Sequence, residues 1–386
     1  MAISKPLTTT SNSLKAVEWM WKANEDPFSG EKAEWKHYSD VENMIIERAY
    51  QNKESQAVLD VYYIDFNDNL QISTEDSYKQ RPVERVVRKR EDKHLREARF
   101  MDLPVSSDRS FGGQYGWMSP FVIEVRRDLN LKMEDLPSKK PQLIPELVEK
   151  AAQGIIKEGK HIKKQREAEE MANTLLETQH KSMEDVWKCC AYLYSLESFL
   201  YKTLNAAMRL VGSKDDEEIW RSKIKTLGPF CLLLWDDPFN KKVRSNIELY
   251  RGANLTPEQI NQYKKMTENE EEYGSFQGFS SCSRNRSKAE NFSDANVLFI
   301  MKVYYAFIAD LSELSEYPEE EEELITPGVC FRVERVEFDK NKKKHYIYLK
   351  LQQRFNGKKQ ESMIAFFAHL TFPFDTRKIV GNKQFI

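Results

Sequence analysis

From Ile144 onward, the spacing of apolar residues changes near Asn246, and this change limits the folds that this part of the chain can adopt. Before it, apolar residues at positions 144, 147, 148, 151, 152 and 155 recur with the period of an α-helix. After it, short apolar runs alternate with turns, as in IELYRG (247–252) and NVLFIMKVYY (296–305). Helices followed by strands are typical of an α+β domain.

Length and composition limit the class of protein further. The chain has 386 residues, which at roughly 100–200 residues per domain predicts two or three domains. With 40% hydrophobic residues, including 17 Tyr, 21 Phe and 7 Trp, it can fill several cores, so a wholly disordered chain is excluded. The net charge of -2 argues against a globally basic nucleic-acid-binding protein.

The cysteines and the apolar runs bear on the compartment. Five cysteines stand at positions 189, 190, 231, 282 and 330, without C-x-x-C spacing, so we expect neither a disulfide framework nor a structural zinc site. The N-terminus lacks an apolar signal segment, and the longest apolar stretch, Val297 to Ala309, is interrupted by Lys302. We expect a soluble protein of the cytoplasm or nucleus, with no membrane association.

Five regions are expected along the chain. A polar, flexible tail spans 1–14, and a small α+β unit spans 15–97, with a helix near Val41–Gln51 and strands at Val58–Phe66, at Asn69–Ser73 and from Arg81 onward. Prolines and glycines indicate a linker from 98, followed by a connecting helix from Ile144 to about Glu177 in which Gly159 allows a break. The main α+β domain is expected over 181–355, and it begins with two helices, over roughly 183–212 and 214–227. The extension 356–386 stays unassigned.

The N-terminal unit resembles a WWE domain. The resemblance rests on the W-x-W start (Trp19, Trp21), on W-x-x-Y at Trp35 and Tyr38, and on the runs IIERAY, YYIDF and RPVERVVR. It implies a half-barrel of strands against one helix. Many members bind the iso-ADP-ribose unit of poly(ADP-ribose). Matched by position, the ligand-binding residues would be Trp35, Tyr63, Gln71 and Arg81.

These residue types suit such a ligand. Adenine needs a flat aromatic face and a hydrogen-bonding amide, and two phosphates suit the fork of a guanidinium. In the other interpretation the aromatic residues are core and Arg81 is a solvated surface charge. Since not every WWE domain binds the polymer, both interpretations stay open for Gln71 and Arg81.

Three short segments carry the argument for the second half of the chain. They are Leu249–Gly252 (LYRG), Gly278–Ser283 (GFSSCS) and Tyr317–Pro327 (YPEEEEELITP). Each alone is a weak signal, but their order and spacing resemble the R-S-E class of ADP-ribosyltransferases, the clostridial-toxin-like and arginine-specific type. The resemblance covers roughly residues 185–352. It implies a helical N-terminal lobe and a split β-sandwich with an NAD cleft.

By this resemblance, Arg251 matches the arginine that contacts NAD phosphate and supports the pocket. Ser281 matches the first serine of a Ser-Thr-Ser motif, in which Cys282 replaces the threonine. That serine orients the active-site glutamate and the nicotinamide ribose. Gly252 has no side chain, which allows the backbone to approach the nicotinamide amide closely.

Two aromatic residues complete the expected NAD-binding set. Phe292, eleven residues after Ser281, matches an aromatic residue that stacks on nicotinamide. Tyr317 stands where related enzymes carry an aromatic residue of the substrate loop. NAD is expected as a substrate rather than as a redox cofactor, because no Rossmann or Walker glycine motif occurs. No metal spacing is present either.

The run of five glutamates leaves two registers for the catalytic pair. The family carries E-x-E directly before an apolar strand. Alignment on Leu324-Ile325 makes Glu322 catalytic and Glu320 its partner, whereas the competing register uses Glu321 and Glu323. In either, a carboxylate at the ribose 2′-hydroxyl stabilises the oxocarbenium-like transition state.

The first carboxylate of the E-x-E pair bears on the acceptor. A guanidinium is protonated at neutral pH and needs a carboxylate to hold it and take its proton. We therefore expect mono-ADP-ribosylation of protein arginine side chains, with release of nicotinamide. The alternatives are an NAD glycohydrolase and a non-catalytic adaptor that binds poly(ADP-ribose).

Overall fold

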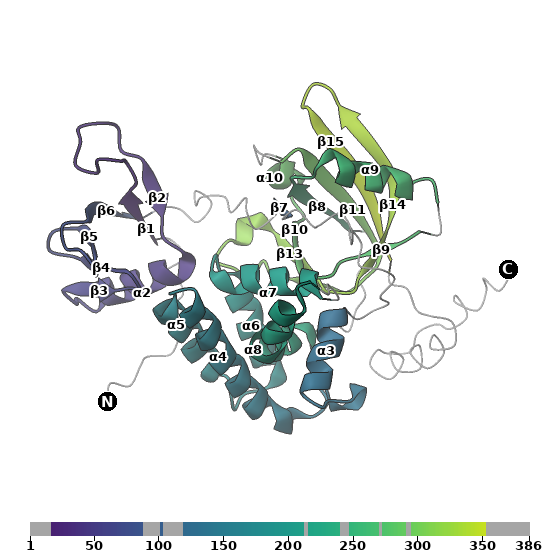
Figure 1. Cartoon of the computed structure of the whole chain (residues 1–386), viewed down its shortest axis with the longest axis horizontal. Helices are drawn as coiled ribbons and strands as arrows, with labels where there is room; N and C mark the ends of the chain where they lie inside the picture. The colour runs from purple at the N-terminus through teal and green to yellow at the C-terminus, as the bar shows by residue number, and fades with distance from the viewer. Residues whose placement is uncertain are drawn as a thin grey trace.

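The computed structural model describes residues 17–87, 101–102, 119–211, 215–239, 247–269, 272–290 and 295–352. Figure 1 shows three parts: an N-terminal sheet with one helix, a helical lobe, and a larger C-terminal sheet. This mixed architecture confirms the expected α+β class. The expected tail (1–14) and extension (356–386) lie outside the described residues.

The N-terminal unit is a six-stranded antiparallel sheet packed on one helix. Its strands are β1 (Val17–Lys22), β2 (Trp35–His37), β3 (Gln56–Val58), β4 (Tyr62–Asp65), β5 (Leu70–Ser73) and β6 (Gln80–Val87), in the order β2-β1-β6-β5-β4-β3. The helix α2 (Asp40–Gln51) begins at a capping box between Ser39 and Glu42. The run expected as one strand over Val58–Phe66 is instead a hairpin, because Val58 pairs with Tyr63.

A buried carboxylate joins the helix and the sheet of this unit. Glu47 of α2 accepts a hydrogen bond from the Trp19 indole at 2.8 Å and two from Arg85 at 2.7 and 2.9 Å. Trp19 also packs in the apolar core of the unit, beside Ile46 and Ile64. Trp19 therefore has a structural role here.

In the part of the chain that the structure describes, the helical lobe contains six α-helices that share one core. They are α3 (Pro120–Asp128), α4 (Ile144–His161), α5 (Gln165–Leu176), α6 (Met183–Ser195), α7 (Phe199–Leu210) and α8 (Glu217–Trp235). Phe121, Ile155 and Phe230 are fully buried in this core. The linker expected over 98–142 therefore contains α3, which belongs to the lobe because its apolar face is buried there.

The expected helix boundaries differ from the observed ones in three places. The helix expected to run to about Glu177 divides between α4 and α5, and the one expected over 183–212 divides between α6 and α7, where Ser198 caps α7. The third, expected over 214–227, continues to Trp235. The break after α4 lies close to Gly159, where the sequence allows one, whereas apolar spacing alone did not locate the break between α6 and α7.

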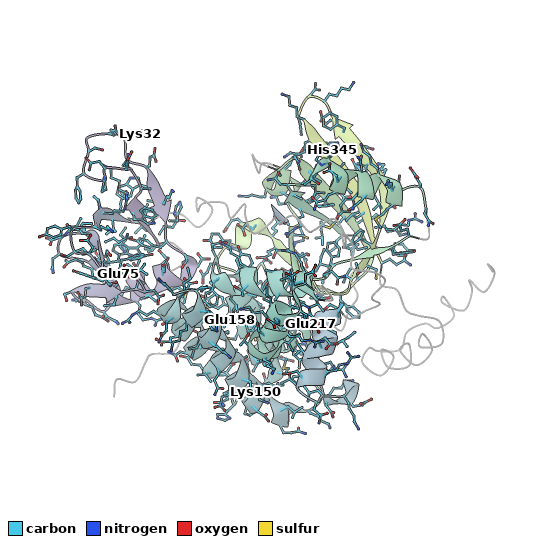
Figure 2. All side chains as sticks on the ribbon, viewed as in Figure 1. Lys32, Glu75, Lys150, Glu158, Glu217 and His345 are labelled. Carbon is cyan, nitrogen blue, oxygen red and sulfur yellow. The ribbon has the colours of Figure 1, made fainter. Side chains whose placement is uncertain are left out.

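Helices α4 and α8 pack very closely. A Cβ on Gly154 would lie 1.8 Å from the Thr226 carbonyl oxygen, so only glycine fits at this crossing. One turn further along α4, Glu158 (labelled in Figure 2) is paired with Lys223 and accepts a hydrogen bond from the Thr226 hydroxyl. The buried negative charge of Glu158 is thus paired with Lys223 across the contact between α4 and α8.

The C-terminal sheet has nine strands among the described residues. Its strands are β7 (Met101–Asp102), β8 (Ile247–Ala253), β9 (Gly274–Ser275), β10 (Ser280–Ser283), β11 (Val297–Tyr305), β12 (Ile308–Asp310), β13 (Glu322–Ile325), β14 (Cys330–Asp339) and β15 (Lys344–Gln352). The order is β12-β13-β10-β8-β11-β15-β14-β9, with β7 paired to β8. The short helices α9 (Pro257–Met266) and α10 (Arg286–Glu290) and a 3-10 turn, η6 (Pro318–Glu320), complete this part.

The two faces of this sheet pack against different partners. Leu249, Cys282 and Ile325 belong to an apolar core of the sheet itself. Phe279 and Leu324 belong to the core of the helical lobe. We call these the core face and the lobe face of the sheet. No helix among the described residues is long and apolar enough to cross a bilayer.

Candidate active site

Strand pairing brings the three segments singled out in the sequence side by side. β10 lies between β8, which carries Arg251 and Gly252, and β13, which begins at Glu322. In the β10–β13 register, Ser281 is opposite Leu324 and Ser283 is opposite Glu322. Residues that are distant in sequence therefore form one continuous patch of the sheet.

The register also decides which side chains share a face. Residues directly opposite each other on antiparallel strands point to the same face, and alternate residues of one strand do too. Ser281, Ser283 and Glu322 therefore lie on the lobe face with Leu324. Because Ser283 is opposite Tyr250 on β8, Gly252 belongs to this face as well. Glu322 is fully buried there.

Glu323 points to the core face. It is opposite Cys282, whose side chain packs in the core of the sheet. Its carboxylate pairs with Arg284 at 3.3 Å, and Arg284 also pairs with Asp310 at 3.0 Å. Glu323 is thus engaged in an ion-pair network on the face opposite Ser281.

Glu320 and Glu321 lie in the turn before the strand. Glu320 ends η6, and Glu321 has the left-handed conformation, with φ 46°. The extended backbone begins only at Glu322, so the alternation rule that would place Glu320 and Glu322 on one side does not apply. Glu320 is nevertheless buried and close to β10, because the Ser283 hydroxyl donates to its carbonyl oxygen at 2.7 Å.

Arg251 supports β10 from the neighbouring strand. It is 4% exposed, and its Nη1 donates to the Ser281 carbonyl oxygen. It is opposite Phe299 of β11, which packs in the core of the sheet. Of the two roles expected for Arg251, support of the pocket corresponds to this contact. Phe292 lies outside the described residues.

Asn205 of α7 is a residue that the motifs did not single out. Its Nδ2 donates to the Tyr194 hydroxyl at 2.8 Å. Its Oδ1 would lie 3.0 Å from a Cβ on Gly278, the residue that precedes Phe279 and β10. Helix α7 thus contacts the segment Gly278–Ser283 directly. The sequence motifs do not indicate this contact, because it depends on how α7 and the segment pack in the fold.

Tyr317 reaches the N-terminal unit. The residue is 3% exposed, and its hydroxyl donates to Asp40 Oδ1 of α2 at 2.6 Å. The aromatic residue expected in the substrate loop is therefore held by a carboxylate of another domain. Immediately after it come η6 and the strand that carries Glu322.

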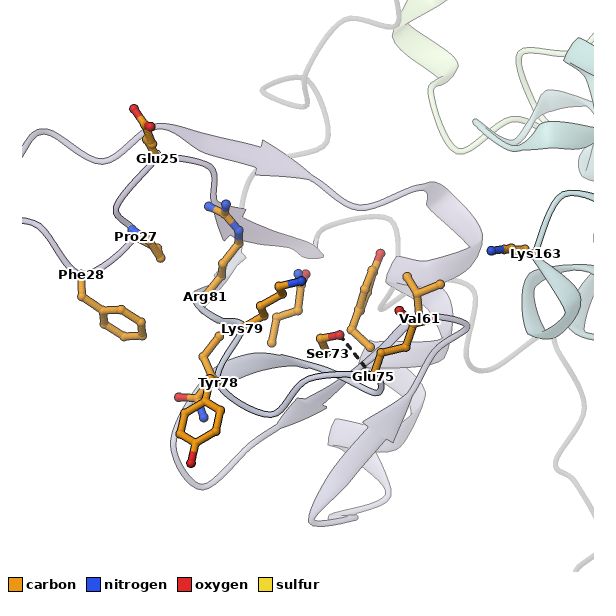
Figure 3. Close-up of a pocket in the computed structure, with 13 residues that line it drawn as sticks. Glu25, Pro27, Phe28, Val61, Ser73, Glu75, Tyr78, Lys79, Arg81 and Lys163 are labelled. Atoms are coloured by element: carbon orange, nitrogen blue, oxygen red, sulfur yellow. Dashed lines mark hydrogen bonds between the residues drawn. The ribbon is translucent and has the colours of Figure 1, made fainter.

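The N-terminal unit has a pocket of about 600 Å³ (Figure 3), within the range of about 300–1,000 Å³ usual for small-molecule sites. Its lining comprises Glu25, Pro27, Phe28, Val61, Tyr62, Gln71, Ser73, Glu75, Tyr78, Lys79, Gln80, Arg81 and Lys163. Of the four residues carried over, Gln71 and Arg81 line it. Trp35 and Tyr63 lie outside this lining, and Tyr62, on the other face of β4, lines it instead.

Several polar groups of this pocket are fixed by the protein. Arg81 Nη1 donates to the carbonyl oxygens of Lys22 and Asn24, at 2.9 and 2.8 Å, and the guanidinium lies 5.4 Å from the centre of the Trp21 ring. The Tyr62 hydroxyl donates to Glu42 at 2.7 Å. Burial and the Glu42 carboxylate raise the pKa of Tyr62, so its hydroxyl stays protonated.

Lys163 belongs to the connection between α4 and α5, yet it lines the pocket of the N-terminal unit. Figure 3 shows it on the Val61 side, opposite Arg81. Together with Lys79 and Arg81 it gives the pocket three cationic side chains. Among the described residues, no group of three or more His, Cys, Asp or Glu side chains could hold a metal ion.

Two family models match the chain. The model described as NAD:arginine ADP-ribosyltransferase matches residues 129–356, more than half of the sequence. It therefore begins before residue 181, where the domain was expected to start, and includes α4 and α5. The model described as WWE domain matches residues 17–85. No curated protein matches the chain.

Several solved structures are similar to this chain. The type III effector XopAI from Xanthomonas axonopodis pv. citri has a TM-score of 0.41 at 14% identity, over 61% of this chain and 95% of its own. HopU1, an ADP-ribosyltransferase of Pseudomonas syringae pv. tomato DC3000, has a TM-score of 0.37 at 17% identity, over 47% and 87%. C3stau2 from S. aureus, solved with NAD, has a TM-score of 0.32 at 19% identity, over 47% and 92%.

Proposed function

The chain belongs to the NAD:arginine ADP-ribosyltransferase family and carries a WWE domain, and from this we propose that it transfers ADP-ribose from NAD to arginine side chains of proteins. The family match supports ADP-ribosyl transfer. The arginine acceptor and the ligand of the WWE domain are our proposals.

One observation carries the proposal for the catalytic site. Ser281, Ser283 and Glu322 share the lobe face of adjacent strands, while Glu323 is committed to Arg284 on the other face. This supports Glu322 as the catalytic glutamate. A hydroxyl and a carboxylate on one face are what the ribose of NAD requires, since both can hydrogen-bond to its hydroxyl groups.

The chemistry follows from the charges that develop. The bond between nicotinamide and ribose breaks, nicotinamide leaves as a neutral molecule, and positive charge develops on the ribose. The Glu322 carboxylate, bonded to the 2′-hydroxyl, stabilises this charge more in the transition state than in the ground state. Arg251 holds the strand that carries Ser281 in place. Gly252 leaves room on the lobe face, which it shares with Glu322.

Glu320 is the basis for proposing arginine as the acceptor. A guanidinium nitrogen that attacks the ribose must lose a proton as the new bond forms, and a nearby carboxylate can hold the cation and accept the proton. The Glu320 backbone is fixed to Ser283, two residues from Ser281, which supports its carboxylate acting beside the reaction centre. An arginine side chain suits this anionic partner.

We propose that the WWE pocket binds the iso-ADP-ribose unit of poly(ADP-ribose). Lys79, Arg81 and Lys163 offer positive charge for two phosphates, and Tyr62 offers an aromatic surface for a base. Glu25 and Glu75 can accept hydrogen bonds from ribose hydroxyls. A transferase with this domain would act where the polymer has already been made.

The decisive experiment incubates the full chain with NAD labelled in its ADP-ribose moiety and with agmatine, a small guanidino acceptor. Label on agmatine together with released nicotinamide supports arginine-type transfer. Nicotinamide without labelled agmatine would favour the glycohydrolase. Neither product, from a folded chain that still binds iso-ADP-ribose, would favour a non-catalytic adaptor.

A further inference from the structure

We propose that Asp40 of the WWE domain is a positioning residue for the transferase, and that it acts by holding Tyr317 of the acceptor loop. We define the acceptor loop as residues 315–321, the segment before Glu322. This inference rests on the proposed function, because it concerns the acceptor step of that reaction. It makes the WWE domain part of the catalytic unit, beyond its own ligand binding.

Asp40 is held rigidly. It is the first residue of α2 and is 9% exposed. Its Oδ2 accepts a hydrogen bond from the Glu197 amide at 2.6 Å, and its own amide donates to the Glu197 carbonyl at 3.2 Å. These two bonds fix the start of α2 to the break between α6 and α7. The second carboxylate oxygen, Oδ1, is thereby presented to Tyr317.

Tyr317 is equally constrained. Its hydroxyl donates to Asp40 Oδ1 at 2.6 Å, and its amide donates to the Ser315 hydroxyl at 3.1 Å. Hydrogen bonds to an ionised acceptor are stronger than neutral ones, and burial strengthens them further. The bond therefore fixes both the ring and the backbone at the start of η6.

A second contact joins α2 to the same loop. The Tyr192 hydroxyl lies 3.4 Å from the Met44 sulfur of α2. The Glu316 carboxylate of the loop lies beside this hydroxyl, and burial and Glu316 raise the pKa of Tyr192. The acceptor loop is thus in contact with α2 and with α6, and its position depends on how these two helices are held together.

The two glutamates should respond differently if Tyr317 moves. Glu322 belongs to β13 and is held by its pairing with β10. Glu320 belongs to η6, three residues after Tyr317. Its carbonyl oxygen is held by the Ser283 hydroxyl, whereas its side chain extends from the turn that begins at Tyr317. Loss of the Asp40–Tyr317 bond should therefore displace the Glu320 carboxylate, which serves the acceptor, and leave Glu322, which serves NAD cleavage, in place.

The chain offers a matched control at the same domain interface. Asp60 of the WWE domain accepts a hydrogen bond from the Arg166 amide at 2.7 Å and so caps α5 of the helical lobe. Like Asp40, it is a WWE carboxylate bonded to a backbone amide of the lobe. Unlike Asp40, it has no contact with the acceptor loop among its described hydrogen bonds. Asp60→Ala therefore shows the effect of losing an interface hydrogen bond while the acceptor loop keeps its contacts.

The experiment compares Asp40→Ala, Tyr317→Phe, their double variant and Asp60→Ala in the full chain. Two rates are measured on each preparation. One is the transfer of label to agmatine, and the other is the release of nicotinamide by hydrolysis of NAD when no agmatine is present. We expect Asp40→Ala and Tyr317→Phe each to lower the ratio of transfer to release by about tenfold, the loss typical of one hydrogen bond to a charged group. The double variant should lose no more than either single one, and Asp60→Ala should keep the ratio.

Several outcomes would overturn the inference. An unchanged ratio in Asp40→Ala, or equal loss of both rates in Asp40→Ala and Asp60→Ala, would reduce Asp40 to an interface residue. Additive losses in the double variant would show that Asp40 does not act through Tyr317. If Asp40→Ala does not fold, Tyr317→Phe decides, because it removes only the hydroxyl. Absence of both activities in the unmutated chain would instead contradict the proposed function, and the inference with it.

Discussion

The five consecutive glutamates from 319 to 323 have sharply different surroundings. Glu320 is buried in η6, Glu321 takes a left-handed conformation, and Glu322 begins β13 on the lobe face. Glu323 is paired with Arg284 on the core face. At the scale of single residues, chemical identity therefore decides little, and the backbone conformation at each position decides the surroundings of its carboxylate.

The first prediction concerns the catalytic register. Glu322→Gln should keep NAD binding but lose both transfer and nicotinamide release by about 10²–10³-fold, because it removes the charge that stabilises the transition state. Nicotinamide release and NAD titration of the same preparation measure the two properties.

The neighbouring variant is the control. Glu323→Gln should keep turnover within about tenfold while it weakens the folded state, because it breaks a buried ion pair away from the reaction. Near-normal turnover of Glu322→Gln together with an inactive, folded Glu323→Gln would reverse the assignment.

The second prediction concerns the acceptor. Glu320→Gln should abolish labelling of agmatine, because only the acceptor needs this carboxylate. Release of nicotinamide by hydrolysis of NAD should stay largely intact. The ratio of the two rates on one preparation measures the effect. Equal loss of both would mean that Glu320 supports the pocket in general, and the proposal of an arginine acceptor would lose its main support.

At the scale of elements, the WWE fold depends on one buried carboxylate between its helix and its sheet. Glu47 accepts hydrogen bonds from Trp19 on β1, from Arg85 on β6 and from Gln51 on α2. Burial raises the pKa of Glu47, but the hydrogen bonds from Arg85, Trp19 and Gln51, with the Arg85 charge, lower it below its ordinary value. The carboxylate is therefore more acidic in the folded state than in the unfolded one.

The third prediction follows from this network. Glu47→Gln should lower the free energy of unfolding at pH 7 by about 3 kcal/mol, the lower end of the range for breaking a buried ion pair, since Arg85 is partly exposed. A depressed pKa contributes stability above the unfolded value of about 4.3, and this contribution is lost as the pH falls through the folded pKa.

Urea unfolding of the full chain at pH 7 and at pH 3.5, followed by tryptophan fluorescence, tests this. The difference between the unmutated chain and Glu47→Gln should be smaller at pH 3.5. Glu84 is an exposed residue of β6, next to Arg85. Glu84→Gln should have little effect at either pH. A difference that stays constant with pH would show that packing, rather than the charge, is responsible.

At the scale of the whole molecule, the WWE domain contacts the helical lobe and the C-terminal part at several places. Asp40 is bonded to Glu197 and to Tyr317, Asp60 caps α5, and Arg48 pairs with Glu170. The connection between α4 and α5 supplies Lys163 to the WWE pocket. The helical lobe therefore contacts both the WWE pocket and the segment that carries Asp40.

The fourth prediction concerns this shared pocket. Lys163→Asn should weaken binding of iso-ADP-ribose to the full chain about two- to fivefold, the effect of losing one exposed charge. The difference should shrink at high salt, because exposed charges are screened. Calorimetric titration at low and high salt measures it.

The substitution is chosen to spare the backbone. Lys163 has φ 59°, a left-handed conformation that asparagine tolerates well. Lys343 has φ 50° and lies in the turn between β14 and β15, so Lys343→Asn removes the same charge in a similar conformation outside the pocket lining. Equal effects of the two variants would mean that only the overall charge of the protein matters.

The sequence by itself determined the α+β class and the two families, and it predicted the segments proposed to carry the chemistry. These signals are local. Apolar spacing shows a helix such as α4, and short motifs such as Tyr250-Arg251-Gly252 and the serines of β10 keep their identity without any long-range contact. Their strength is enough to indicate the family, ADP-ribosyl transfer and a proposed site.

Only the tertiary structure decided which side chains meet. The choice of Glu322 over Glu323 depends on the register between β10 and β13, and a shift of one residue would exchange the faces. The bond between Asp40 and Tyr317 joins residues 277 positions apart, and Lys163 reaches a pocket of another domain. Such contacts depend on how whole elements pack, and no local pattern in the chain encodes that packing.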